Sequence, residues 1–196
     1  MKLFESRIEM IHAILTDDMV GCELGVFAGE FAEHLAKRRP RKLILIDAWQ
    51  GEGPQDLIFS GDQDGNNGTT YPAFLLYEKV KHIFADNPAV EIRKGWTFDE
   101  IPKLEDKSLD YVYIDADHSY EGMKRDLELI YPKMKPYGLI LGHDYEMNFE
   151  KATYNWKFGV RQAVDEFCEK YNYRVVAKAM DGCVSFCLLH SSFLNG

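Results

Sequence analysis

Residues 109–122, LDYVYIDADHSYEG, decide the fold of this chain, because they predict a buried strand that runs into a helix. The stretch 109–114 is rich in aromatic and branched apolar residues, which favour a strand inside a sheet. Two carboxylates and an imidazole follow at once, in Asp115, Asp117 and His118. Charged side chains are rare in buried strands. Their position therefore indicates that the strand delivers them to an edge of the sheet.

The same alternation of strand and helix extends in both directions from this stretch. The predicted strands cover 20–27, 42–49, 89–95, 109–115, 138–144, 173–180 and 183–190. The predicted helices cover 3–15, 29–39, 71–86, 120–134 and 159–171. This alternation predicts an α/β, Rossmann-like fold, with seven strands in a mostly parallel sheet and helices on both faces. The Asp181-Gly182 pair predicts a tight hairpin, which makes the C-terminal strand antiparallel.

Length and composition predict one globular domain over 1–196, and the helix expected within 1–17 is a candidate contact to a second copy. The chain is 46% apolar and has a net charge of −9. This acidic balance disfavours nucleic acid or an anionic membrane as a partner. The N-terminus lacks a signal-peptide pattern, and no apolar run reaches the roughly 18 residues of a membrane span. The four cysteines fit structural thiols, so the expected compartment is a reducing cytoplasm.

Five of the predicted strands end in polar or glycine-rich residues. In an open parallel sheet these carboxyl ends meet at one edge, where ligands bind. The residues expected at this edge are Glu23, Gly25, Phe27, Gly29, Asp47, Trp96, Thr97, Asp115, Asp117, His118, His143 and Asp144. Surface loops are generally polar, so a single ending of this kind is weak evidence. The agreement of five endings predicts a ligand site.

The first of these endings predicts a site for a nucleoside. Gly25 and Gly29 allow a tight turn and a close approach of a ligand to the backbone. The G-x-G-x-x-G pattern of dinucleotide sites is missing. Asp47 lies about 20 residues further on, where a carboxylate can accept the hydroxyls of a ribose. The alternative interpretation is a structural turn and an acid that caps a helix.

Four stretches carry a resemblance to a known family. They are ELGVFAGEFAEHLA (23–36), LILIDAW (43–49), YIDADHSYEGMKRDLELIYPKMKPYGLILGHDY (113–145) and GVRQAVDEF (159–167). From about residue 18 to 190 the chain resembles class I S-adenosylmethionine (SAM)-dependent methyltransferases, including their closing antiparallel strand. Within that class it is similar to the small branch that includes the macrocin-type sugar O-methyltransferases. Catechol O-methyltransferase resembles it more distantly.

The resemblance implies which residues hold the cofactor. They are Glu23, Gly25, Phe27, Gly29, Asp47, Trp96, Thr97 and Asp115. The glycine turn is implied to hold the amino-acid part of SAM, with Phe27 at an aromatic position of that motif. Asp47 is implied to hold the ribose, and Trp96 and Thr97 to flank the adenine.

The resemblance also implies a divalent metal and a base. Asp115 and Asp144 match the metal ligands, and His118 matches the base. His143 is the candidate third ligand, although some relatives have an acid at its position. Oxygen ligands suit Mg²⁺, a bound cation makes a hydroxyl more acidic, and a neutral histidine can then take its proton. Structural alternatives remain for both histidines, while Asp117 is either a further ligand or a helix cap.

The leading hypothesis is an enzyme that methylates an oxygen of a small hydroxylated acceptor, such as a sugar or a natural product. The predicted loops 50–70 and 145–158 would form the acceptor pocket. A nitrogen acceptor is an alternative. Others are a non-haem iron oxygenase that uses two histidines and a carboxylate, and a non-catalytic SAM-binding module. The missing dinucleotide pattern counts against an NAD-dependent dehydrogenase.

Overall fold

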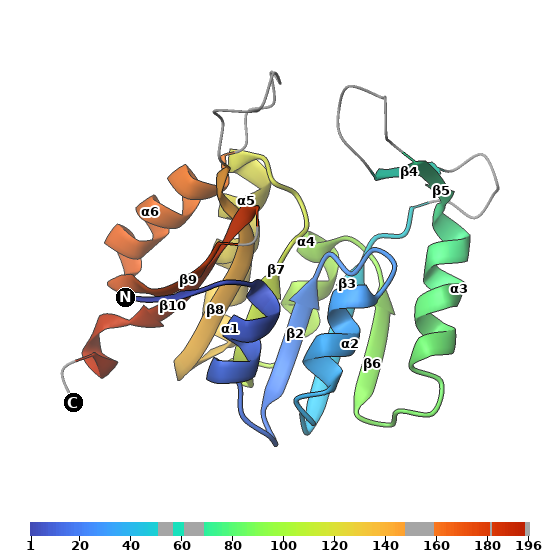
Figure 1. The fold of residues 1–196 in the computed structure, drawn as a ribbon, viewed down its shortest axis with the longest axis horizontal. Coiled ribbons are helices and arrows are strands. Elements are labelled where there is room, and N and C mark those ends of the chain that lie inside the picture. Colours follow the sequence, from blue (N-terminus) through green and yellow to red (C-terminus); the bar gives the residue numbers. More distant parts are fainter. Residues whose placement is uncertain (51–56, 61–68, 148–158, 181, 195–196) are drawn as a thin grey trace.

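The computed structural model describes residues 1–50, 57–60, 69–147, 159–180 and 182–194, which form a sheet between two layers of helices (Figure 1). The strands of the main sheet are β1 (Lys2–Phe4), β2 (Val20–Leu24), β3 (Lys42–Asp47), β6 (Val90–Lys94), β7 (Leu109–Ile114), β8 (Met134–Met147), β9 (Tyr173–Ala179) and β10 (Cys183–His190). Their order across the sheet is β1-β9-β10-β8-β7-β2-β3-β6. Strand β10 is antiparallel to both of its neighbours, and the other pairs are parallel. The mostly parallel sheet with one antiparallel C-terminal strand is thus confirmed.

The prediction of seven strands was wrong, because the described sheet has eight. The predicted N-terminal helix is a short strand, β1, followed by α1 (Arg7–Ile14). Ser6 separates them: its Oγ accepts a hydrogen bond from Glu9 N at 3.1 Å, and Glu9 Oε2 accepts one from Glu5 N at 2.9 Å. The Ser6 cap starts the helix at Arg7, and the preceding residues pair with β9.

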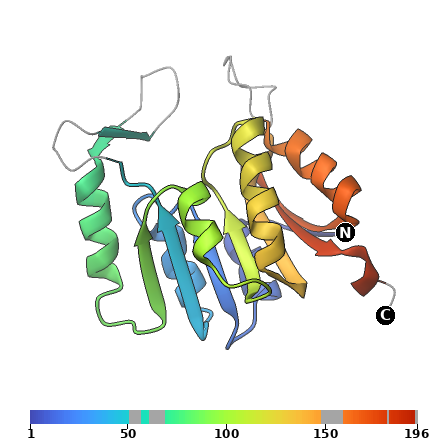
Figure 2. The ribbon, with the colours of Figure 1, turned by 180° about the vertical axis from the view of Figure 1, so that it is seen from behind.

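Helices cover both faces of the sheet (Figures 1 and 2). The helices are α1, α2 (Glu30–Ala36), α3 (Ala73–Ile83), α4 (Thr97–Glu100), α5 (Tyr120–Ile130) and α6 (Val160–Tyr171), with 3₁₀ turns η1 (Ile101–Lys103), η2 (Tyr131–Lys133) and η4 (Ser191–Phe193). Leu43 and Leu45 of β3 pack in the apolar cluster with α1, α2 and α3, while Ile44 and Ile46 pack in the cluster with α5 and α6. This burial on both faces explains why the central strands are continuous apolar runs.

The two stretches predicted as substrate loops lie largely outside the described residues. In the first, residues 51–56 and 61–68 lie outside, and the described remainder includes β4 (Leu57–Ser60), which pairs antiparallel with β5 (Thr69–Pro72). In the second, β8 continues to Met147 and residues 148–158 lie outside. Among the helices that the structure describes, none has the length and apolar character needed to cross a membrane.

Candidate functional site

The glycine turn after β2 packs tightly against the end of β7. Gly25 has a φ of +85°, and a Cβ added to it would lie 2.2 Å from the carbonyl oxygen of Asp115. Only glycine fits both constraints. Glu23 lies beneath this turn with 1% of its surface exposed, and its Oε2 has no hydrogen-bond partner. The turn therefore combines a tightly packed glycine with a buried carboxyl oxygen that has no hydrogen-bond partner.

Asp47, at the end of β3, holds the same turn in place. Its Oδ2 accepts hydrogen bonds from Val26 N and Phe27 N, both at 2.8 Å, and its Oδ1 accepts one from Trp49 N at 2.9 Å. Burial raises the pKa of Asp47, although these backbone N–H groups oppose the rise. The backbone N–H of Ala48 also lowers this pKa through a hydrogen bond, so four backbone donors surround the carboxylate. A role in binding ribose stays a prediction, and the structure adds a role in shaping the turn.

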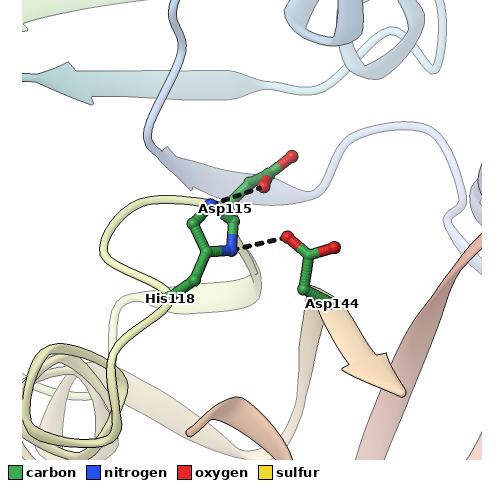
Figure 3. Close-up of side chains that lie close together, drawn as sticks. All are labelled: Asp115, His118 and Asp144. Carbon is green, nitrogen blue, oxygen red and sulfur yellow. Dashed lines mark ion pairs between the residues drawn. The ribbon is translucent and has the colours of Figure 1, made fainter. Parts of the chain in front are cut away.

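Four side chains converge beside this turn, two from the segment between β7 and α5 and two from β8. His118 Nδ1 lies 2.6 Å from Asp144 Oδ2, and His118 Nε2 lies 3.8 Å from Asp115 Oδ1 (Figure 3). His143 Nδ1 lies 3.2 Å from Asp144 Oδ1 and 3.7 Å from Asp115 Oδ1. Asp144 has a φ of +56°, a conformation that non-glycine residues rarely adopt. The two predicted acids and the two predicted histidines therefore form one cluster.

The charges of this cluster are coupled. Burial alone would raise the pKa of Asp144, but hydrogen bonds from His118 and His143 hold it well below its usual range. Burial alone would lower the pKa of His118, but the hydrogen bond to Asp144 and the charges of Asp144, Asp115 and Asp117 raise it. The His118–Asp144 contact is therefore an ion pair, in which the imidazole can lose its proton only above its raised pKa.

The cluster also has donor atoms that suit a divalent metal. Asp115, His118 and Asp144 each offer one ligand atom, and these atoms all lie within 4.8 Å of one another. Two carboxylate oxygens and an imidazole nitrogen fit Mg²⁺, Mn²⁺ or Fe²⁺. His118, predicted as the base, belongs to this group, while His143 borders it through its contact with Asp144.

Arg7 completes the cluster and was missed by the sequence analysis. This residue of α1 places its Nη1 3.1 Å from Asp115 Oδ2. Its guanidinium carbon lies over the ring of Phe31, 4.8 Å from the centroid. The sequence offers no local signal for this position, because it depends on how β1 and α1 pack against the rest of the fold.

Asp117 takes part in starting α5. Its Oδ1 accepts a hydrogen bond from Ser119 N at 3.0 Å, and the Ser119 side chain accepts one from Gly122 N at 3.1 Å. Ser119 is thus the helix cap, and Asp117 supports it from outside the helix. This matches the capping role more closely than the metal role that was the alternative.

Trp96 and Thr97 follow β6 and have different environments. Trp96 is 43% exposed and stacks on Phe98, with ring centroids 5.7 Å apart. Thr97 is buried, and its Oγ1 donates a hydrogen bond to Asp126 Oδ1 at 2.7 Å. The exposed ring of Trp96 leaves a surface on which a planar base could stack, whereas the hydroxyl of Thr97 is directed to α5.

Asp126 is fully buried, although a charged residue of a helix usually lies on a solvated face. The stripe formed by Met123, Leu127 and Ile130 includes its position at helical spacing, so the signal was present in the sequence. Its Oδ2 has no hydrogen-bond partner, and burial raises its pKa to about 6.

Asp126→Asn is expected to stabilise the protein more at neutral pH than at acidic pH. The folded state favours the protonated carboxyl, so the contribution of Asp126 to stability is present below pH 4 and is lost as the pH rises through about 6. The interval between 3.8 and about 6 corresponds to roughly 3 kcal/mol, since one pKa unit is about 1.4 kcal/mol. Urea unfolding of both proteins between pH 4.5 and 7.5 measures the difference. Asp99 is exposed, so Asp99→Asn serves as the matched control. If the stability difference between Asp126→Asn and the unmodified protein did not change with pH, the raised pKa of Asp126 would be contradicted.

Comparisons with known proteins identify the family of this chain. A family model described as a methyltransferase domain matches residues 20–145. An uncharacterised protein of Acanthamoeba polyphaga mimivirus is 25% identical over 155 residues, which cover 76% of this chain and 59% of that protein. The chain therefore spans less than two thirds of the length of this relative.

Solved structures share the fold at low sequence identity. A SAM-dependent methyltransferase from Aquifex aeolicus superposes with a TM-score of 0.60 at 15% identity, covering 94% of this chain and 90% of that one. An O-methyltransferase from Bacillus cereus in complex with S-adenosylhomocysteine (SAH) gives a TM-score of 0.58 at 13% identity, covering 93% and 78%. At such identities the likeness establishes the fold alone. Because the matched family segment includes the glycine turn, Asp47 and the acid-histidine cluster, the chain belongs to the methyltransferase-domain family and has the fold of class I SAM-dependent methyltransferases.

Proposed function

We propose that this protein transfers the methyl group of SAM to an oxygen atom of a small hydroxylated acceptor. The observation that carries the proposal is the buried Glu23 beneath the Gly25 turn. Burial, and then the charges of Asp115 and Asp47, raise the pKa of Glu23 well above its usual range. A buried carboxyl oxygen without a partner destabilises a protein, and a donor supplied by a ligand would relieve this cost. The α-ammonium group of SAM is such a donor.

The residues of the turn fit the cofactor on grounds of chemistry. When bound, SAM supplies a methyl group activated by its sulfonium. The buried carboxyl of Glu23 offers an acceptor for the ammonium, Asp47 fixes the turn through its backbone hydrogen bonds, and the exposed ring of Trp96 offers a stacking surface for adenine. These roles follow the family resemblance.

His118 is the proposed base. Its Nδ1 contacts Asp144, so Nε2 is the atom proposed to take the proton of the acceptor hydroxyl. The acceptor oxygen then forms a bond to the methyl carbon, the carbon–sulfur bond breaks, and SAH is the product. Asp115 and Asp144 would hold a divalent cation, which would make the hydroxyl more acidic. Alignment of the reacting atoms supplies the main part of such catalysis.

The three residues whose ligand atoms lie closest together favour this function over an iron oxygenase. The close group contains one histidine and two carboxylates, whereas the facial triad of such oxygenases has two histidines and one carboxylate. The buried Glu23 also has no role in an oxygenase. A SAM-binding module without activity would keep the cofactor residues, and it is distinguished by the effect of a His118 substitution on turnover.

Glu23→Gln is expected to weaken SAM binding by about 10–100-fold, because hydrogen bonds to charged groups contribute about 1.5–3 kcal/mol. Glutamine keeps the shape of the side chain but cannot ionise to pair with the ammonium group. Calorimetric titration of SAM and SAH, with and without Mg²⁺, measures the effect, and thermal unfolding confirms that the variant is folded. The exposed Glu121→Gln is the control. Absence of SAM binding by the unmodified protein in both conditions would refute the proposed function.

A further inference from the structure

Arg7 brings a positive charge to the ends of β2 and β7 from outside the segment that matches the family. The match begins at residue 20, whereas Arg7 is the first residue of α1. Its ion pair with Asp115 and its position over the Phe31 ring hold the guanidinium in place. The side chain is still 30% exposed, so a ligand can reach it.

Arg7 and Glu23 place a guanidinium and a buried carboxyl beside the same turn. The charge of Arg7 favours the ionised form of Glu23 and so opposes the rise in its pKa that burial, Asp115 and Asp47 cause. Asp115 links the two halves of this arrangement, because its side chain contacts Arg7 and its carbonyl oxygen lies against Gly25. A carboxyl with an unsatisfied oxygen and a guanidinium therefore flank one glycine turn.

A ligand that complements these two groups has an ammonium and a carboxylate close together. We propose that Arg7 binds the α-carboxylate of SAM while Glu23 faces its α-ammonium group. This inference rests on the proposed function and adds the group that recognises the amino-acid end of the cofactor. A guanidinium has five N–H donors in a planar fork, so it can serve a second carboxylate while it keeps its contact with Asp115.

The test compares two ligands that differ in the amino-acid part. SAH has the α-amino and α-carboxylate groups, whereas 5′-methylthioadenosine has the same nucleoside and a thioether without them. Calorimetry on the full chain measures the affinity of each ligand for the unmodified protein and for Arg7→Met. We expect Arg7→Met to weaken SAH binding by about 10–100-fold and to leave 5′-methylthioadenosine binding unchanged. Arg41→Met, at the opposite end of β3, is the matched control and should bind both ligands as the unmodified protein does.

Three other outcomes would overturn the inference. Unchanged SAH affinity in a folded Arg7→Met protein would limit Arg7 to its contacts within the protein, such as the ion pair with Asp115. An equal loss for both ligands would assign Arg7 a structural role. If the unmodified protein bound neither ligand, the proposed function would fail together with this inference. Arg7→Lys keeps the charge without the planar fork, so a smaller loss confined to SAH is expected, and this variant decides the question if Arg7→Met does not fold.

Discussion

Replacing His118 with glutamine is expected to lower the rate of methyl transfer by about 10²–10⁴-fold, the range typical for removal of a general base. Glutamine is polar and of similar length, but it has no basic nitrogen. The effect should fall on turnover, because His118 contacts Asp144 and Asp115 rather than the glycine turn. Single-turnover rates with labelled SAM and an acceptor found by screening measure it, and SAH calorimetry shows whether the cofactor still binds.

Varying the Mg²⁺ concentration separates a base from a metal ligand. If His118 is the base, the loss persists at saturating Mg²⁺ and is partly rescued by added imidazole. A loss that disappears as Mg²⁺ rises would make His118 a ligand, consistent with its place beside Asp115 and Asp144. His82→Gln, on the exposed surface of α3, is the matched control and should retain full turnover. A His118→Gln protein with undiminished turnover would contradict both roles.

Gly25→Ala is expected to destabilise the protein by at least about 3 kcal/mol and to abolish SAH binding. Two costs combine in this variant. Alanine at a φ of +85° is strained by about 1–2 kcal/mol, and its Cβ would lie 2.2 Å from the carbonyl oxygen of Asp115. A backbone atom cannot move aside as the end of a side chain can, so the ends of β2 and β7 must separate. Urea unfolding gives the loss in the free energy of unfolding.

Gly182→Ala is the matched control for this substitution. Gly182 has a φ of +100°, and a Cβ added to it would meet no atom within 4 Å. This variant therefore carries the strain of the backbone conformation without the collision, and a loss of about 1–2 kcal/mol is expected. If the two variants lost the same stability, the contact between Gly25 and Asp115 would have no measurable effect.

The main sheet and the convergence of its strand ends could be predicted because both follow from short-range patterns. All six residues of β7 are buried, and the apolar run that predicted this strand stops where the burial stops. Strands β7 and β8 are parallel neighbours, so the polar residues that follow their apolar runs must lie close together. The cluster of Asp115 and Asp144 follows directly from that adjacency.

The remaining features depend on contacts that a local pattern does not contain. Arg7 reaches Asp115 across 108 positions of sequence. Strand β1 is too short for its three residues to show an alternation, and its pairing with β9 joins the two ends of the described chain. The burial of Asp126, in contrast, could have been predicted from a local pattern, because its position falls within the apolar stripe of α5. The charge of its side chain pointed instead to the solvated face of the helix.

The pairing of β1 with β9 determines when the site can be completed during folding. Residue 2 pairs with residue 177, so the entropy of closing a very long loop must be overcome before β1 docks. Strand β1 also lies at the edge of the sheet, where opening requires the least free energy (Figure 1). Local opening at this edge would carry Arg7 away from Asp115 while the central strands stay paired. Hydrogen exchange should therefore show the backbone amides of β1 exchanging sooner than those of β2 and β7, and SAH should slow this exchange if Arg7 binds the cofactor.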